Sequence, residues 1–210
     1  MISARHPARV ATVATLALAA LAPGGGSLAA SKPKPPPPEY LFAGVPWNLP
    51  PDSVRVRLVA RGYRPVSQAS DSFQVVFRGR LFEHDALVTG SLDDHRRLVR
   101  WVVLIASRGD EYKWPDMKAV FDEVAQESEG RYGPPRSITE KYTFPARKGD
   151  ARQDEALRDG NLDLHWVWES KNGQRLTVGM DENVSVVLSY ESPEWAGFQK
   201  RRRAKRASDL

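Results

Sequence analysis

The chain contains no cysteine among its 210 residues. It therefore has no disulfide framework, no cysteine nucleophile and no thiolate metal site. It also offers no cysteine for lipid attachment after export. A folded domain must depend on its own apolar core, and the roughly 155 residues between Tyr40 and Trp195 are enough to form one.

The sequence also lacks the short motifs of common active sites. It has no Gly-x-Ser-x-Gly nucleophile elbow, no Gly-x-Gly-x-x-Gly and no phosphate-binding lysine loop. Gly24, Gly25 and Gly26 form the one glycine run, and it belongs to the leader described below. We therefore expect no catalytic residue, no cofactor and no bound metal, and a protein that is not an enzyme.

An excess of one charge is confined to the C-terminus. The whole chain has 31 basic and 26 acidic residues, a net charge of +5. Without the basic C-terminal end and the two arginines of the first ten residues, the rest of the chain is close to neutral. The positive net charge of the chain therefore gives no evidence for a nucleic-acid-binding face. We predict a basic tail, residues 193–210, that contacts anionic lipid. Its basic residues are Lys200, Arg201, Arg202, Arg203, Lys205 and Arg206.

A single long apolar run is present, at residues 10–22, and it follows the basic residues Arg5 and Arg9. Glycines and then small residues, Ala29 and Ala30, come after it. This order is typical of a secretory signal peptide, predicted here as residues 1–30. The alternative is a membrane anchor, but the run spans only about 20 Å as a helix, less than the ~30 Å hydrocarbon core. We expect an exported protein, periplasmic or extracellular, without a transmembrane segment in its mature part.

Residues 31–39 include four consecutive prolines, which favour an extended spacer over a proline-recognition ligand.

Two similar units follow, residues 40–107 and 108–192. In the first, a predicted helix begins near Asp52 and ends at Gly62. In the second, a longer helix begins at Trp114 and ends at Gly133. Its apolar stripe has helical spacing and comprises Met117, Val120, Phe121, Val124 and Ala125.

Alternating segments after each helix predict antiparallel strands joined by short turns. Asn172-Gly173 is the strongest hairpin signal, and one helical turn is expected near 154–157. The fold class is α+β: two tandem helix-plus-meander units forming a two-layer helix-on-sheet sandwich. Whether the units share one sheet is left open. The predicted strands are 72–81, 86–92 and 98–106, then 137–144, 162–169, 174–180 and 184–190.

The beginnings and ends of the two predicted helices carry a set of motif residues. They are Gly44, Val45, Pro46, Trp47, Asp52, Val54, Leu58 and Gly62, then Trp114, Val120, Phe121, Tyr132, Gly133 and Pro134. In these residues the chain resembles the outer-membrane assembly lipoproteins of the BamE/SmpA type, the tandem-repeat β-lactamase inhibitory proteins, and uncharacterised exported bacterial proteins with an Arg-Tyr-Gly-Pro helix end. The lipoproteins have a lipid-attached cysteine that this chain lacks.

Histidines and carboxylates gather at two turns. His84 and Asp85 precede one predicted strand, and Asp93, Asp94 and His95 follow it. These are metal-ligand types, yet a seven-residue strand of about 23 Å places them at opposite ends. We therefore interpret them as two polar turns. His165 alternates with apolar neighbours, so we expect it to face outward from its strand rather than act as a base.

Six tryptophans are present, and most are expected in the core. We predict that Trp47, with Pro46 and Tyr63, forms an exposed partner-binding patch. The leading hypothesis is a non-enzymatic exported domain that binds an envelope or secreted protein or another envelope component. The alternatives are an inhibitor of an extracytoplasmic enzyme, which requires an exposed aromatic sheet face, and a hydrolase with dispersed catalytic residues.

Overall fold

The computed structural model describes residues 39–66, 73–106 and 114–208. The predicted signal peptide and residues 31–38 of the predicted spacer lie outside the described residues. Within the described ranges, no helix combines the length and apolar character required to cross a bilayer.

The described chain contains helices and strands and is an α+β fold. Each of the seven predicted strands is present, with ends shifted by no more than two residues. The helical segments are η1 (Phe42–Gly44), α1 (Pro51–Val59), α2 (Trp114–Tyr132), α3 (Gln153–Arg158) and α4 (Trp195–Ser208). The strands are β1 (Arg64–Pro65), β2 (Gln74–Leu81), β3 (His84–Leu92), β4 (Leu98–Ile105), β5 (Ser137–Tyr142), β6 (Leu162–Glu169), β7 (Arg175–Met180) and β8 (Val186–Glu191).

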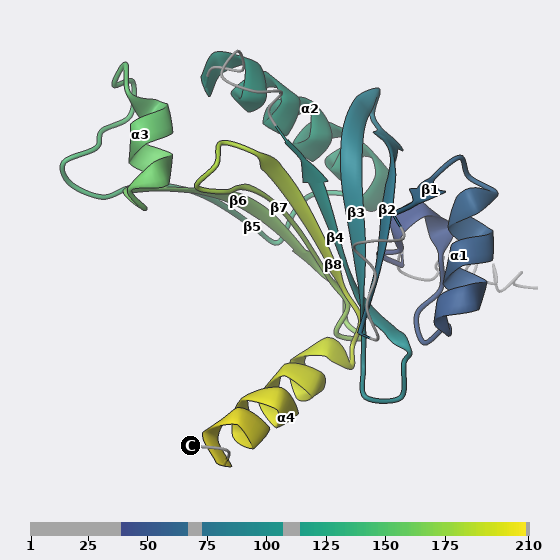
Figure 1. Ribbon diagram of the computed structural model, residues 1–210. Coiled ribbons are helices and arrows are strands. Elements are labelled where there is room, and N and C mark those ends of the chain that lie inside the picture. The colour runs from purple at the N-terminus through teal and green to yellow at the C-terminus, as the bar shows by residue number, and fades with distance from the viewer. Residues whose placement is uncertain (1–38, 67–72, 107–113, 209–210) are drawn as a thin grey trace, which may run out of the picture. The chain divides into compact units, whose positions relative to one another are not determined.

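All eight strands belong to one antiparallel sheet in the order β1-β2-β3-β4-β8-β7-β6-β5 (Figure 1). The question of one sheet or two is therefore answered: β4 pairs with β8, and this pairing joins the strands that precede α2 to those that follow it. Trp101 lies opposite Tyr190, and Val103 lies opposite Leu188. Alternation along the strands gives this one sheet two chemically different faces.

The main core lies on one face of the sheet, together with α1 and α2. Val54 and Leu58 of α1 and Phe121 of α2 belong to the same buried cluster as Trp101 and Leu188 of the central strands. The predicted stripe of α2 is confirmed: Met117, Phe121, Val124 and Ala125 are buried, and Val120 is partly buried against the same cluster. Phe42 of η1 packs on the middle of the sheet, with its ring centroid 5.5 Å from Trp101 and 5.8 Å from Tyr190.

Glycine ends both core helices as predicted. Gly62 and Gly133 have φ angles of +86° and +82°. Glycine adopts this left-handed conformation without the penalty that a Cβ introduces. The hairpin at Asn172-Gly173 is also present between β6 and β7, and Gly173 has a φ of +86°.

The opposite face of the sheet is rich in charge near the start of β4. Arg100 pairs across the strands with Glu191, Glu191 with Arg175, and Arg175 with Glu169. Glu169 also forms an ion pair with Arg136, just before β5. Opposite charges directly across an antiparallel pair are favourable. This row of alternating charge crosses four strands at the end of the sheet where α4 begins.

Candidate functional site

The predicted aromatic patch is not an exposed cluster. Pro46 is exposed, but Trp47 is half-buried and packs against the main core. Tyr63 is only 7% exposed, and its hydroxyl donates to the Arg80 carbonyl at 3.1 Å. Burial raises the pKa of Tyr63 above the ordinary value of tyrosine. Tyr63 is therefore a core residue with little surface to offer a partner.

The C-terminal segment is a helix, and it begins at a well-packed site. The Ser192 amide donates to the Val99 carbonyl at 3.0 Å just before α4 begins. Trp195 and Phe198 then form a second buried cluster with Val99, separate from the main core. Their ring centroids are 5.6 Å apart. The first turn of α4 is thus attached to β4, at the end of the sheet where β8 finishes (Figure 1).

Arg100 strengthens this attachment from the charged face of the sheet. Its guanidinium lies 5.0 Å from the centroid of the Trp195 ring, within the range of a cation–π contact. Its Nε donates to Ser189 Oγ at 3.0 Å and lies 3.7 Å from Glu191 Oε1. Burial lowers the pKa of Arg100, and the Glu191 carboxylate opposes this shift. The guanidinium therefore remains a charged partner for the indole.

Beyond Phe198 the helix is basic. Lys200, Arg201, Arg202, Arg203 and Lys205 are exposed, and α4 contains no acidic residue. Successive helical positions turn by about 100°, so these five side chains point to several sides of the helix end. Basic residues also favour the C-terminal end of a helix, where the macrodipole is negative. The end of α4 is consequently a concentrated cationic surface.

A small hollow of about 160 Å³ lies where the apolar and basic parts of α4 meet. Trp195 and Phe198 supply its apolar wall, and Arg202 and Arg203 supply charge. The Arg202 guanidinium also lies 5.6 Å from the centroid of the Phe198 ring. The lining spans just over two helical turns from Trp195 to Arg203, so the hollow brings apolar and cationic side chains together.

The histidine and carboxylate positions remain apart, as the strand length predicted. His84 begins β3 and pairs with Glu123 of α2 at 3.2 Å, while β3 ends at Leu92. At the other end, Asp93 Oδ1 accepts from the backbone amides of His95 and Arg97 at 2.9 and 2.8 Å. No metal-binding cluster of three or more His, Cys, Asp or Glu side chains occurs among the described residues.

His165 projects from the charged face of the sheet, away from the main core. Its Nδ1 lies 2.7 Å from Asp163 Oδ1, and the side chain is 29% exposed. Leu162, Leu164 and Trp168 alternate with these residues and are buried on the core side. The outward orientation expected for His165 is therefore correct. No hydroxyl partner places this histidine in a catalytic arrangement within the described contacts.

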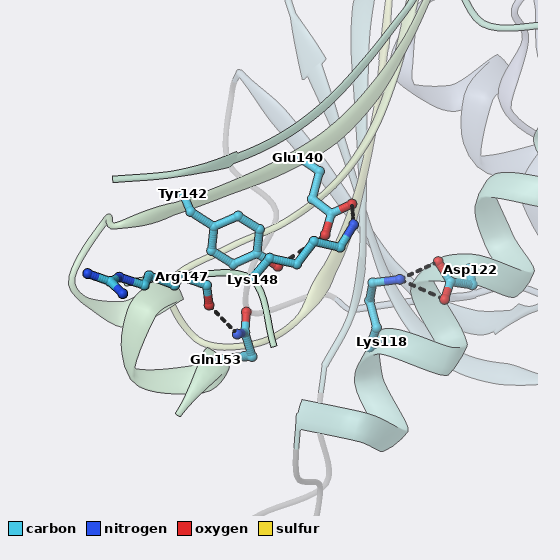
Figure 2. A network of polar contacts seen from close by, with 7 residues as sticks. All are labelled: Lys118, Asp122, Glu140, Tyr142, Arg147, Lys148 and Gln153. Carbon is cyan, nitrogen blue, oxygen red and sulfur yellow. Dashed lines mark hydrogen bonds and ion pairs between the residues drawn. The ribbon is translucent and has the colours of Figure 1, made fainter. Parts of the chain in front are cut away.

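A polar network holds α3 and the preceding loop near the edge strand β5 (Figure 2). Glu140 of β5 accepts from Lys148 Nζ at 2.9 Å and from the Tyr142 hydroxyl at 3.0 Å. These bonds, the Lys148 contact foremost, lower the pKa of Glu140. Gln153 of α3 donates to the Arg147 carbonyl at 3.0 Å. Glu140 and Lys148 neutralise each other, so the network stabilises the loop and offers no vacant carboxylate for a ligand.

On the neighbouring helix α2, Lys118 is held in the same way by Asp122. Its Nζ lies 2.7 Å from each oxygen of that carboxylate (Figure 2). The same Nζ lies 5.6 Å from the Phe121 ring centroid. A lysine bound to both oxygens of one carboxylate is already neutralised. It is therefore a poor candidate for a ligand contact or a general base.

An open groove of about 980 Å³ lies at the end of the sheet where β2 and β4 finish and β3 begins. His84, Glu83 and Asp85 line it, together with three arginines and apolar side chains. The lining includes no serine, threonine or cysteine within the described residues. The groove therefore combines a histidine and carboxylates without a hydroxyl or thiol nucleophile.

Comparison of the chain with protein-family models, curated proteins and solved structures finds no match.

Proposed function

We propose that this chain is an exported, non-enzymatic domain that binds the cell envelope, and that α4 makes the contact with an anionic lipid surface. The observation that carries the proposal is the basic end of α4, which has no acidic residue and is attached to the sheet through Trp195 and Phe198. Each basic side chain near an anionic membrane contributes up to about 1 kcal/mol. Five exposed cations on one short helix are enough for peripheral binding.

The attachment of α4 favours a held cationic surface over a solvated, frayed tail. Arg100 and Val99 of β4 contact its first turn, so the helix leaves the domain in a defined direction. The hollow beside Arg202 and Arg203 adds apolar contact at the level of the lipid headgroups. Because the basic residues surround the helix end, we expect binding at the headgroups without deep insertion of one apolar face.

The proposal includes the two tandem units expected from the sequence. One unit would consist of α1 with β1 to β4, and the other of α2 with β5 to β8, α3 being inserted after β5. The strand order is symmetric about the β4–β8 pair, which supports this division. In this arrangement the duplicated scaffold presents the helix, and α4 follows the last strand of the second unit.

The two other hypotheses receive no specific support. None of the strand residues on the face opposite α1 and α2 is aromatic in the described chain, whereas an inhibitor of the expected kind needs exposed aromatics there. A hydrolase needs a nucleophile beside a histidine, and the groove that holds His84 lacks one among its described lining. Binding through α4 is therefore the function we propose.

Vesicle co-sedimentation tests this function. The variant Lys200→Gln, Arg201→Gln, Arg202→Gln, Arg203→Gln, Lys205→Gln should bind phosphatidylglycerol vesicles at least about tenfold more weakly than the unmodified protein. The matched control makes the same charge change elsewhere on the exposed surface, at Arg55, Arg57, Arg97, Lys141 and Lys171. Binding should also weaken as salt is added. Equal loss in both variants, or unchanged binding in the α4 variant, would contradict the proposal.

A further inference from the structure

Two arginines face each other across the edge of the sheet. β1 has only two residues, and Arg64 is the direct cross-strand partner of Arg78 in β2. Directly opposite residues in an antiparallel pair have Cβ atoms about 4.5–5.5 Å apart, and like charges there are destabilising. The pairing continues through the Val66 amide, which donates to the Val76 carbonyl at 2.8 Å. The fold therefore places two arginine side chains side by side at the edge of the sheet.

Neither arginine is neutralised by the described part of the chain. Arg64 and Arg78 are both exposed, and no described carboxylate forms an ion pair with either. The third arginine nearby, Arg80, differs, because its guanidinium pairs with Glu83 at 3.1 Å. Within the described residues, two adjacent positive charges are therefore left for an external anion.

Both arginines line the 980 Å³ groove. Leu87 is the cross-strand partner of Arg78 on β3, and Leu104 of β4 lies opposite Leu87. These three side chains thus form one row on the same face of the sheet. The row leads from the guanidinium pair to an apolar wall within the groove, so a ligand bound by the arginines has room for a larger attached group.

From this geometry we infer that the groove binds a phosphate group between Arg64 and Arg78. Each guanidinium can donate two parallel hydrogen bonds to phosphate oxygens. A phosphate monoester carries a charge of about −1.5 to −2 at neutral pH, which matches the two guanidinium charges. Binding of this dianion would also remove the repulsion between the two arginines. The ligand is either a soluble phosphate monoester or the phosphate headgroup of a lipid.

The inferred site is independent of the contact proposed for α4. Val99, at the start of β4, packs against α4, whereas Ile105, at the end of β4, lines the groove. They are six positions apart along the strand, a distance of about 20 Å. A surface in contact with α4 therefore need not reach the groove, and substitutions in one place leave the other intact.

Calorimetric titration of the full chain with inorganic phosphate and with glycerol 3-phosphate tests the site. Arg64→Gln and Arg78→Gln should each weaken binding by about tenfold or more, since each removes charge-assisted hydrogen bonds. Arg55→Gln, at an exposed position on α1, is the matched control and should bind like the unmodified protein. Without phosphate, neither groove variant should unfold more easily, because each relieves the arginine repulsion.

A second experiment measures binding to phosphatidylcholine vesicles that contain phosphatidic acid. Here the groove substitutions are made in the fivefold α4 variant. If only these vesicles bind, and Arg64→Gln and Arg78→Gln reduce the binding, the phosphate belongs to a lipid headgroup and the inference holds. If soluble phosphates bind with the same dependence, the ligand is a soluble monoester. The inference is overturned if Arg64→Gln and Arg78→Gln leave both kinds of binding unchanged, or if Arg55→Gln reduces them equally.

Discussion

The Arg100 guanidinium lies 5.0 Å from the centroid of the Trp195 ring, so a strand at the middle of the sheet holds the first turn of the terminal helix. Arg100 is itself fixed by Ser189 Oγ and Glu191 of the neighbouring strand. The direction of α4 is therefore set by contacts between β4, β8 and the helix. These contacts connect the sheet to the basic surface for which we propose a function.

Trp195→Ala should release α4 and leave the sheet folded. The substitution removes the indole that contacts Phe198 and Arg100, while the main core does not include Trp195. We expect amide hydrogen exchange in α4 to accelerate by about tenfold or more, because opening of the helix becomes a local event. Exchange in β4 and β8 should change little. Phe144→Ala, at a side chain that is 84% exposed, is the control and should leave exchange in α4 unaltered.

Gly79→Ala should destabilise the protein. A Cβ on Gly79 would lie 2.2 Å from Cδ1 of Tyr63, whose ring is buried and whose hydroxyl is bonded to Arg80. We expect a loss of about 1–3 kcal/mol in the free energy of unfolding, the range for overpacking. Urea denaturation measures it.

Gly130→Ala is the matched comparison for Gly79→Ala. Gly130 lies in α2, and apart from the neighbouring backbone of the helix no atom is within 4 Å of the position that the alanine methyl group would occupy. Alanine is favoured over glycine inside a helix by about 0.5–1 kcal/mol, so this variant should be more stable than the unmodified protein. Equal stability changes in the two variants would show that Tyr63 adjusts without cost.

Most of the fold could be predicted from local patterns. The alternating runs located β2 to β8, and the stripe that includes Met117 and Phe121 located α2, because one face of each element is buried. The single sheet could not be predicted in this way. It depends on the pairing of β4 with β8, which are far apart in the sequence and would alternate identically in two separate sheets.

The candidate sites were less predictable, because they depend on contacts between distant residues. Tyr63 looked like a surface residue beside a helix end, but Gly79 of β2 leaves space for its ring and so allows it to be buried. The basic residues of α4 were evident from composition, whereas the attachment of Trp195 to β4 was not. Similarly, the sequence did not predict β1, because a two-residue strand that includes a proline gives no alternating pattern. Its pairing is nevertheless what brings Arg64 opposite Arg78.

Tyr142 should make the protein sensitive to alkali. Burial and the hydrogen bond from its hydroxyl to Glu140 raise the pKa of Tyr142 to about 12. An unfolded tyrosine has a pKa of about 10, so the neutral form is favoured by the fold. This contribution to stability is fully present below about pH 10 and is lost as the pH rises through about 12.

In urea denaturation at increasing pH, Tyr142→Phe should reduce the alkaline loss of stability. The control is Lys141→Gln, an exposed neighbour on the other face of β5, which should retain the full loss. An identical pH dependence in Tyr142→Phe and the unmodified protein would contradict the assignment.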